Sequence, residues 1–83
     1  MSRDEIKAIT KRFLSEEFEV DQSEIEDQKV LKDTLELDSL DYVDLVVVIE
    51  ENFGFKTTGE DFKTISMFDD FYSFVERKLS AMS

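Results

Sequence analysis

The amino-acid sequence predicts a single all-α domain over residues 1–83, and three observations support this fold class. Apolar residues recur every three to four positions in three segments, which is the periodicity of amphipathic helices. Strand signals are weak, because the valine-rich run at 46–48 lies inside a longer helical pattern. The length of 83 residues leaves room for one modest core, and the eight phenylalanines argue against disorder.

The chain opens with an amphipathic helix that leads into a long loop. The helix is predicted over residues 3–18. Its apolar positions at helical spacing are Ile6, Ile9, Phe13 and Leu14. Residues 21–29 are polar and show no sustained period, so they are predicted as a loop. We expect Val30, Leu31 and Leu35 to anchor this loop to the core, and a loop of this length in so small a domain is often functional.

A second helix is predicted from about Ser39 to about Phe53, with Gly54 as its stop signal. At about 100° per residue, most of its apolar side chains fall within one broad arc. This expected core face comprises Tyr42, Leu45, Val46, Ile49 and Phe53.

Two apolar residues of the same helix, Leu40 and Val47, lie off that arc and close to Asp44 and Glu51. A surface helix needs only one apolar stripe to pack on a core. The second, narrower strip with its carboxylate border indicates a surface that binds a partner. The alternative is that a central helix is simply buried on most of its sides.

Two further helical segments complete the predicted fold. Residues 60–63 are predicted as one short helical turn after a turn at 57–59, and residues 66–80 as the last helix. The apolar residues at helical spacing are Ile65, just before this last segment, and within it Phe68, Phe71, Tyr72, Val75 and Leu79. Ser66 and Asp69 match the pattern of a capping box at its start.

The net charge of −11 is concentrated in the middle of the chain. From Asp33 to Asp61 there are nine acidic residues and one basic residue, Lys56, so this segment alone carries eight of the eleven net negative charges. Such a surface repels phosphate backbones and anionic membranes, which argues against nucleic-acid and membrane binding. It attracts a basic patch on a protein partner; the alternative is a solvated face that aids solubility.

Several site types are excluded by what the sequence lacks. Without cysteine or histidine the chain can form neither a disulfide nor a His/Cys metal cage. Asp38, Asp41 and Asp44 are spaced by three, which does not fit a calcium loop, so no metal site is expected. Neither a membrane-spanning run nor the apolar core of a signal peptide is seen, so the default expectation is the cytoplasm.

Ser39 has an unusual combination of neighbours for a serine at the start of a helix. Either Asp38 or Ser39 can be the N-cap of the second helix, and Asp41 in the first turn suits the helix dipole. A serine nucleophile normally needs an adjacent base, and the nearest neighbours here are acids. We therefore expect that the protein is not an enzyme and that Ser39, if functional, is modified by another enzyme.

The segment Leu35-Glu36-Leu37-Asp38-Ser39-Leu40-Asp41-Tyr42-Val43-Asp44-Leu45-Val46 resembles the Asp-Ser-Leu segment and second helix of acyl carrier proteins. The resemblance extends over nearly the whole chain: an opening amphipathic helix, a long first loop, a short third helix and a closing helix. It implies a stand-alone carrier with a four-helix bundle. It also implies that a separate, magnesium-dependent phosphopantetheinyl transferase esterifies Ser39 with 4′-phosphopantetheine from coenzyme A.

The resemblance further implies two sets of contact residues. Basic docking surfaces of the transferase and of acyl-transferring or synthase enzymes are expected to bind Asp38, Leu40, Asp41, Val43, Asp44, Val47, Glu50 and Glu51. The acyl chain, held as a thioester on the arm, is expected to fold back between the helices. The candidate lining, whose other role is ordinary core, is Phe13, Leu31, Val46, Ile49, Phe53 and Ile65.

The cargo implied by the resemblance is an acyl intermediate of fatty-acid or related biosynthesis, carried by a monomer. Two alternatives stay open. One is a specialised carrier for polyketide, aryl or aminoacyl units, since no proline opens the short third helix and the closing helix is rich in aromatic residues. The other is a small acidic helical interaction module that has no prosthetic group.

Overall fold

The structure of this chain, a computed structural model, describes residues 1–82. Within these residues it contains four α-helices and two 3₁₀ helices. In chain order these are α1 (Arg3–Phe18), η1 (Gln22–Glu24), α2 (Leu31–Leu35), α3 (Ser39–Phe53), η2 (Gly59–Thr64) and α4 (Phe68–Met82). The only extended pairing in the described part is one isolated bridge between Val30 and Met67. The predicted all-α class is confirmed.

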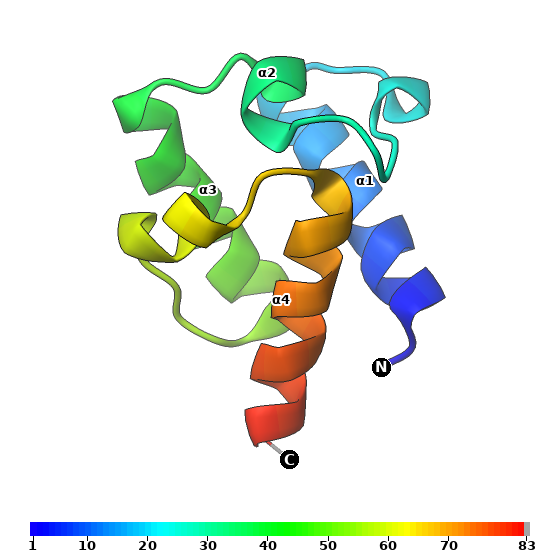
Figure 1. Cartoon of the computed structure of the whole chain (residues 1–83), viewed down its shortest axis with the longest axis vertical. Helices are drawn as coiled ribbons and strands as arrows, with labels where there is room; N and C mark the ends of the chain where they lie inside the picture. Colours follow the sequence, from blue (N-terminus) through cyan, green and yellow to red (C-terminus); the bar gives the residue numbers. More distant parts are fainter. Residues whose placement is uncertain (83) are drawn as a thin grey trace.

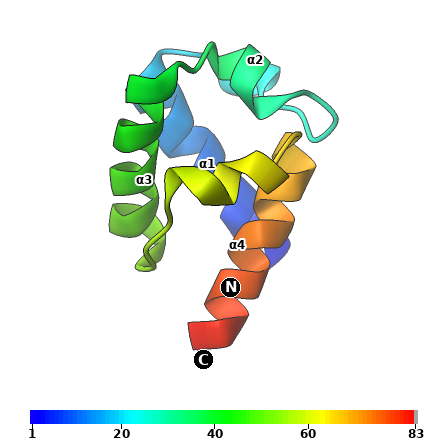
Figure 2. The ribbon, with the colours of Figure 1, turned by 60° about the vertical axis from the view of Figure 1, so that its left-hand side comes forward.

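The long helices form a bundle in which α1 runs in the opposite sense to α3 and α4 (Figure 1). The loop between α1 and α3, together with α2, crosses one end of the bundle. The start of α3 lies at that same end. The short helix η2 crosses between α3 and α4, as both views of the ribbon show (Figure 2). This arrangement leaves one side of α3 at the surface.

The helices predicted at 3–18 and 39–53 are confirmed, and so is the stop at Gly54, which has a φ of 80°. The helix α2 was not expected from the sequence. Its five residues are too few for an apolar period to repeat, although two of the three expected anchors, Leu31 and Leu35, are buried. The third, Val30, is 38% exposed, so the prediction that its side chain anchors the loop to the core is wrong.

The core is rich in phenylalanine and draws on every long helix. Its buried apolar side chains are Ile6, Phe13, Leu14, Ile25, Leu31, Leu35, Leu37, Leu45, Val48, Ile49, Phe53, Phe55, Phe62, Phe68, Phe71, Tyr72, Phe74 and Val75. On α3 the expected core face is largely confirmed, with Tyr42 and Val46 half-buried at its edge. Val48 is also buried, which the helical wheel did not predict.

The first loop caps the start of α4, a contact between segments about forty residues apart in the chain. The backbone N–H groups of Phe68 and Asp69 donate to the carbonyl oxygens of Lys29 and Asp27, at 3.1 and 3.0 Å. The backbone N–H of Met67 donates to Asp70 Oδ2 at 3.0 Å. These bonds satisfy amides that a helix start otherwise leaves unpaired. The predicted Ser66–Asp69 capping box is therefore wrong, because α4 begins two residues later.

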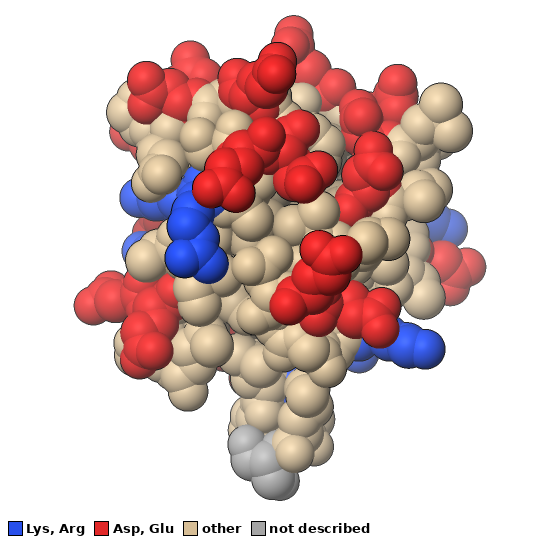
Figure 3. Space-filling model, turned by 180° about the vertical axis from the view of Figure 1, so that it is seen from behind, with Lys and Arg blue, Asp and Glu red and all other residues tan. Residues whose placement is uncertain are grey.

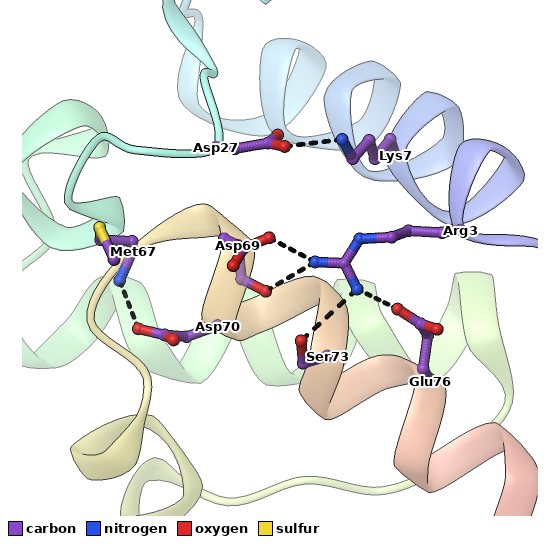
Figure 4. A network of polar contacts seen from close by, with 8 residues as sticks. All are labelled: Arg3, Lys7, Asp27, Met67, Asp69, Asp70, Ser73 and Glu76. Atoms are coloured by element: carbon purple, nitrogen blue, oxygen red, sulfur yellow. Dashed lines mark hydrogen bonds and ion pairs between the residues drawn. The ribbon is translucent and has the colours of Figure 1, made fainter.

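Charged side chains of α1 reach the same region (Figure 4). Arg3 bonds to Asp69, Ser73 and Glu76 on α4, and Lys7 Nζ lies 2.7 Å from Asp27 Oδ2 in the first loop. All these groups are partly exposed, so each ion pair contributes at most about 1 kcal/mol. Their effect is to fix how α1, the first loop and α4 sit against one another.

Tyr72 provides a stability prediction for this part of the bundle. Its ring is fully buried, and its hydroxyl has no hydrogen-bond partner among the described residues. Removing an unpaired buried hydroxyl costs little, so we expect Tyr72→Phe to leave the unfolding free energy at pH 8 unchanged or to raise it by about 1 kcal/mol.

The same variant should behave differently at high pH. Burial, and secondly the charge of Asp27, raises the pKa of Tyr72 from 10.0 to about 12. The unfolded chain therefore loses the Tyr72 proton near pH 10, whereas the folded chain keeps it until about pH 12. Between these pH values deprotonation favours the unfolded state, so the unfolding free energy is unaffected below pH 10 and falls between pH 10 and 12. Urea unfolding at pH 8 and 11.5 should therefore show the native chain losing roughly 1–2 kcal/mol more than Tyr72→Phe. Equal losses in the two proteins would contradict this.

Candidate functional site

Ser39 is the first residue of α3, and Asp38 before it is the N-cap. Asp38 Oδ1 accepts hydrogen bonds from the backbone N–H groups of Leu40 and Asp41, at 2.9 and 3.1 Å. Asp41 Oδ2 in turn accepts from the backbone N–H of Asp38 at 3.0 Å, which completes a capping box. Of the two caps that the sequence left open, the structure selects Asp38.

The hydroxyl of Ser39 is exposed and makes no hydrogen bond within residues 1–82. Since the cap is supplied by Asp38, this hydroxyl has no structural role that a modification would disturb. No histidine exists in the chain to take its proton, and its immediate neighbours are carboxylates. The geometry thus presents an accessible hydroxyl that cannot be activated from within the chain.

The turn before Ser39 directs the chain into α3. Glu36 ends α2 with a φ of 52°, in the left-handed region that favours glycine. The backbone N–H of the next residue, Leu37, donates to the carbonyl oxygen of Lys32 at 3.0 Å, and the Leu37 side chain is buried. This turn and the buried leucine fix where α3 begins.

Beside Ser39 lies a shallow depression of about 340 Å³, which we call the Ser39 depression. It is lined by Ser39, Tyr42, Val43, Val46, Val47, Thr58 and Gly59. Most of these side chains are apolar, so the depression suits an uncharged, flexible chain attached at the hydroxyl.

Thr58 and Gly59, which line the Ser39 depression, belong to a turn that the carboxylate of Asp61 stabilises. Asp61 Oδ2 accepts hydrogen bonds from Thr57 Oγ1 at 2.7 Å and from the backbone N–H of Thr58 at 3.0 Å. These two bonds lower the pKa of Asp61 below its usual value. They fix the turn that carries Gly59 without the help of a proline.

A row of apolar side chains on α3 is exposed next to this site, and we call it the α3 strip. It consists of Leu40, Val43 and Val47, which are 75, 62 and 49% exposed. The alternative that α3 is buried on most sides is therefore wrong. The helical wheel had placed Leu40 and Val47 off the core face; Val43 was expected only from the family resemblance.

Carboxylates surround the α3 strip, as the sequence predicted. Asp44, Glu50 and Glu51 are exposed, whereas Asp41 is half-buried and held in the capping box. Seen from the side opposite to Figure 1, the molecular surface also carries many more acidic than basic side chains (Figure 3). An apolar strip with a negative rim is suited to a partner that has apolar side chains framed by positive charge.

The six acyl-pocket candidates fall into two groups. Phe13, Leu31, Ile49 and Phe53 are core side chains, and the rings of Phe13 and Phe53 pack edge to face with centroids 5.9 Å apart. Val46 lines the Ser39 depression. Ile65 lines a second depression, of about 380 Å³, which was not expected from the sequence.

Asp38→Ala tests the geometry at the start of α3. Loss of the cap should lower the free energy of unfolding by about 1 kcal/mol. In a domain of this size that corresponds to a melting temperature lower by roughly 4–8 °C. Thermal unfolding followed by circular dichroism measures the shift. Asp44→Ala is the matched control, because Asp44 is exposed on the same helix and makes no side-chain hydrogen bond in the described part of the chain. Equal shifts for the two variants would contradict the capping role.

Among the residues that the structure describes, no group of three or more potential ligands is arranged to hold a metal ion. Nor is any helix in residues 1–82 long and apolar enough to cross a membrane.

Comparisons with known proteins show which family this chain resembles. A family model described as "Phosphopantetheine attachment site" matches residues 8–75. A protein named "Acyl carrier protein" from Thermotoga maritima is 42% identical over 78 residues, which cover 94% of this chain and 96% of that protein. Proteins of the same name from Coprothermobacter proteolyticus and Micrococcus luteus are 34% and 31% identical. The first alignment covers 95% of this chain and 96% of the relative, and the second covers 90% and 93%.

Proposed function

Because this chain belongs to the acyl carrier protein family, whose members carry acyl groups on 4′-phosphopantetheine and are not enzymes, we propose that Ser39 is the attachment residue. The observation that carries the proposal is the exposed Ser39 hydroxyl at the start of α3, whose cap is supplied by Asp38. A hydroxyl free of hydrogen bonds can be esterified without loss of the helix start. The alternative of an interaction module with no prosthetic group has no support in the comparisons.

The surroundings of Ser39 fit such a group. A phosphate on Ser39 would be held at the N-terminal end of α3, where the helix dipole favours negative charge. The side chains of Val43, Val46 and Val47 in the Ser39 depression would offer apolar surface to the rest of the group. When bound, the group supplies a terminal thiol that forms thioesters, which the chain itself cannot do because it has no cysteine.

In the attachment reaction the Ser39 hydroxyl oxygen forms a new bond to the phosphorus of coenzyme A that bears the pantetheine. The bond from this phosphorus to the neighbouring phosphate breaks, and the adenosine bisphosphate leaves. A base of the transferase would have to take the serine proton, and its magnesium ion would supply charge stabilisation at the phosphates. At the reacting atoms this chain contributes the positioned hydroxyl, since it has no histidine and the carboxylates of Asp38 and Asp41 are engaged in the capping box.

We propose that the transferase and the acyl-transferring or synthase enzymes bind the α3 strip and its carboxylate rim. The exposure of the three apolar side chains supports this surface, and the acidity of the rim supports basic partners. A carrier must release each partner quickly, which favours a small contact with fast, charge-steered association.

We also propose that residues 1–83 form one domain that works as a monomer in the cytoplasm, in fatty-acid or related biosynthesis. A single core shared by all the long helices supports the domain assignment. In a monomer the α3 strip remains free for partners. Sedimentation equilibrium should give the mass of one chain at micromolar concentration.

The experiment that tests the proposed function is incubation of the purified protein with coenzyme A, magnesium and a broad-specificity phosphopantetheinyl transferase. Intact-protein mass spectrometry should show the gain of one phosphopantetheinyl group and no second addition. No gain with several transferases would overturn the proposal.

A further inference from the structure

The second depression near Ser39 differs in character from the first. It is lined by Val30, Lys32, Tyr42, Gly59, Phe62, Lys63, Ile65 and Ser66, from α2, α3, η2 and the segment before α4. We call it the lysine depression. Val30, Phe62 and Ile65 provide apolar surface, while the exposed residues Lys32 and Lys63 add two positive charges to its lining.

The two depressions adjoin each other, because Tyr42 and Gly59 line both. Tyr42 is half-buried, and its ring packs on Phe62 with centroids 5.4 Å apart. The lysine depression is therefore within reach of a flexible chain that is attached at Ser39 and passes Tyr42.

Neither lysine is engaged by the protein itself. In residues 1–82 the ion pairs within 4 Å involve Arg3, Lys7 and Lys29, and none involves Lys32 or Lys63. Both side chains are exposed. In a chain of net charge −11 with 21 acidic residues, two unpaired lysines on one depression beside the site are a local exception to the negative surface.

We propose that the lysine depression binds the distal carboxylate of an acyl chain that ends in a carboxyl group. This inference rests on the proposed attachment at Ser39 and adds a class of cargo to it. The methylene chain lies against Tyr42, Phe62 and Ile65, and the carboxylate lies between the ammonium groups of Lys32 and Lys63. A cargo with an apolar end leaves both lysines unused.

The test loads the protein with two cargoes of equal length. Octanoyl-coenzyme A and octanedioyl-coenzyme A, the second a monothioester with a free carboxylate, are transferred with a broad-specificity transferase, and the mass of each product confirms loading. The rate at which hydroxylamine cleaves the thioester is then measured, because a cargo held on the protein reacts more slowly.

The lysine variant is Lys32→Gln with Lys63→Gln. We expect it to speed cleavage of the octanedioyl thioester by roughly threefold to tenfold, as the loss of two exposed charge pairs implies. Its effect on the octanoyl thioester should be nil. Raising the salt concentration should speed cleavage of the octanedioyl thioester in the native protein as well. The matched control is Lys11→Gln with Lys56→Gln, which removes the same charge away from the depression and should change neither rate.

Four results would overturn the inference. An unchanged octanedioyl rate would show that the lysines do not bind the carboxylate. Equal effects on both cargoes would mean that the depression is only apolar, and equal effects of the control variant would mean that net charge alone acts. The fourth result comes from NMR spectra of the protein with the unloaded phosphopantetheine arm and with the octanedioyl cargo. If the backbone amide signals of Lys32 and Lys63 shift equally in both, the anion they bind is the phosphate of the arm.

The mass measurement separates this inference from the proposed function. If the protein is loaded but the lysine variant has no effect, the inference fails while the attachment at Ser39 stands. If no mass is gained, both fail together.

Discussion

Ser39→Ala should abolish the gain of a phosphopantetheinyl group completely, because it removes the oxygen that forms the bond to phosphorus. The loss should come without a loss of stability. The Ser39 hydroxyl makes no hydrogen bond within the described residues, and Asp38 supplies the cap of α3. Intact mass after an overnight reaction, together with a thermal unfolding curve, measures both properties in one preparation.

The matched control is Ser66→Ala, since Ser66 is also exposed and lines the neighbouring lysine depression. We expect it to be modified at the native rate. A residual mass gain in Ser39→Ala would show that another side chain accepts the group. A large drop in the melting temperature of Ser39→Ala would mean that the serine has a structural role, and the loss of modification would then need another explanation.

The second large effect concerns the carboxylates beside the α3 strip. Replacing Asp44 and Glu51 with lysine should lower the second-order rate constant of the transferase about tenfold or more at low salt. The slowing should shrink at 0.5 M salt, because the screening length there is only a few ångströms. Initial rates of mass gain at low carrier concentration measure the rate constant directly.

Asp41 is a poor choice for this experiment, although the sequence alone suggests it. Its carboxylate accepts a hydrogen bond from the backbone N–H of Asp38. A lysine at this position would therefore disrupt the start of α3 in addition to reversing the charge. The matched control is Glu16→Lys with Glu17→Lys, two exposed positions at the end of α1. Equal slowing at low and high salt, or equal slowing by the control, would contradict charge-guided docking on α3.

The parts of this fold that could be predicted are those in which a local pattern repeats. The helices α1 and α3 are long enough for their apolar period to show, and Gly54 is a local stop signal. The α3 strip could also be predicted in part, since Leu40 and Val47 fall off the core arc of a single helix. The neighbours of Ser39 in sequence indicated only that it is poorly placed for catalysis, and its role as the attachment residue came from the family resemblance and stays a prediction.

The features that were missed depend on contacts between distant segments. The start of α4 is set by carbonyl oxygens of Asp27 and Lys29, which a local capping pattern cannot reveal. Val48 is buried because neighbouring elements cover more of α3 than the arc of a helical wheel suggests. Lys32 of α2 and Lys63 of η2 line the same depression, although about thirty residues separate them in the chain.

The most direct test of the central claim is to locate the attached group within the chain. After reaction with coenzyme A and the transferase, trypsin releases the segment 33–56, in which Ser39 is the only serine. Fragmentation of this peptide by mass spectrometry should place the whole phosphopantetheinyl mass on Ser39. Finding the added mass on Thr34, on Tyr42 or on any other peptide would contradict the account.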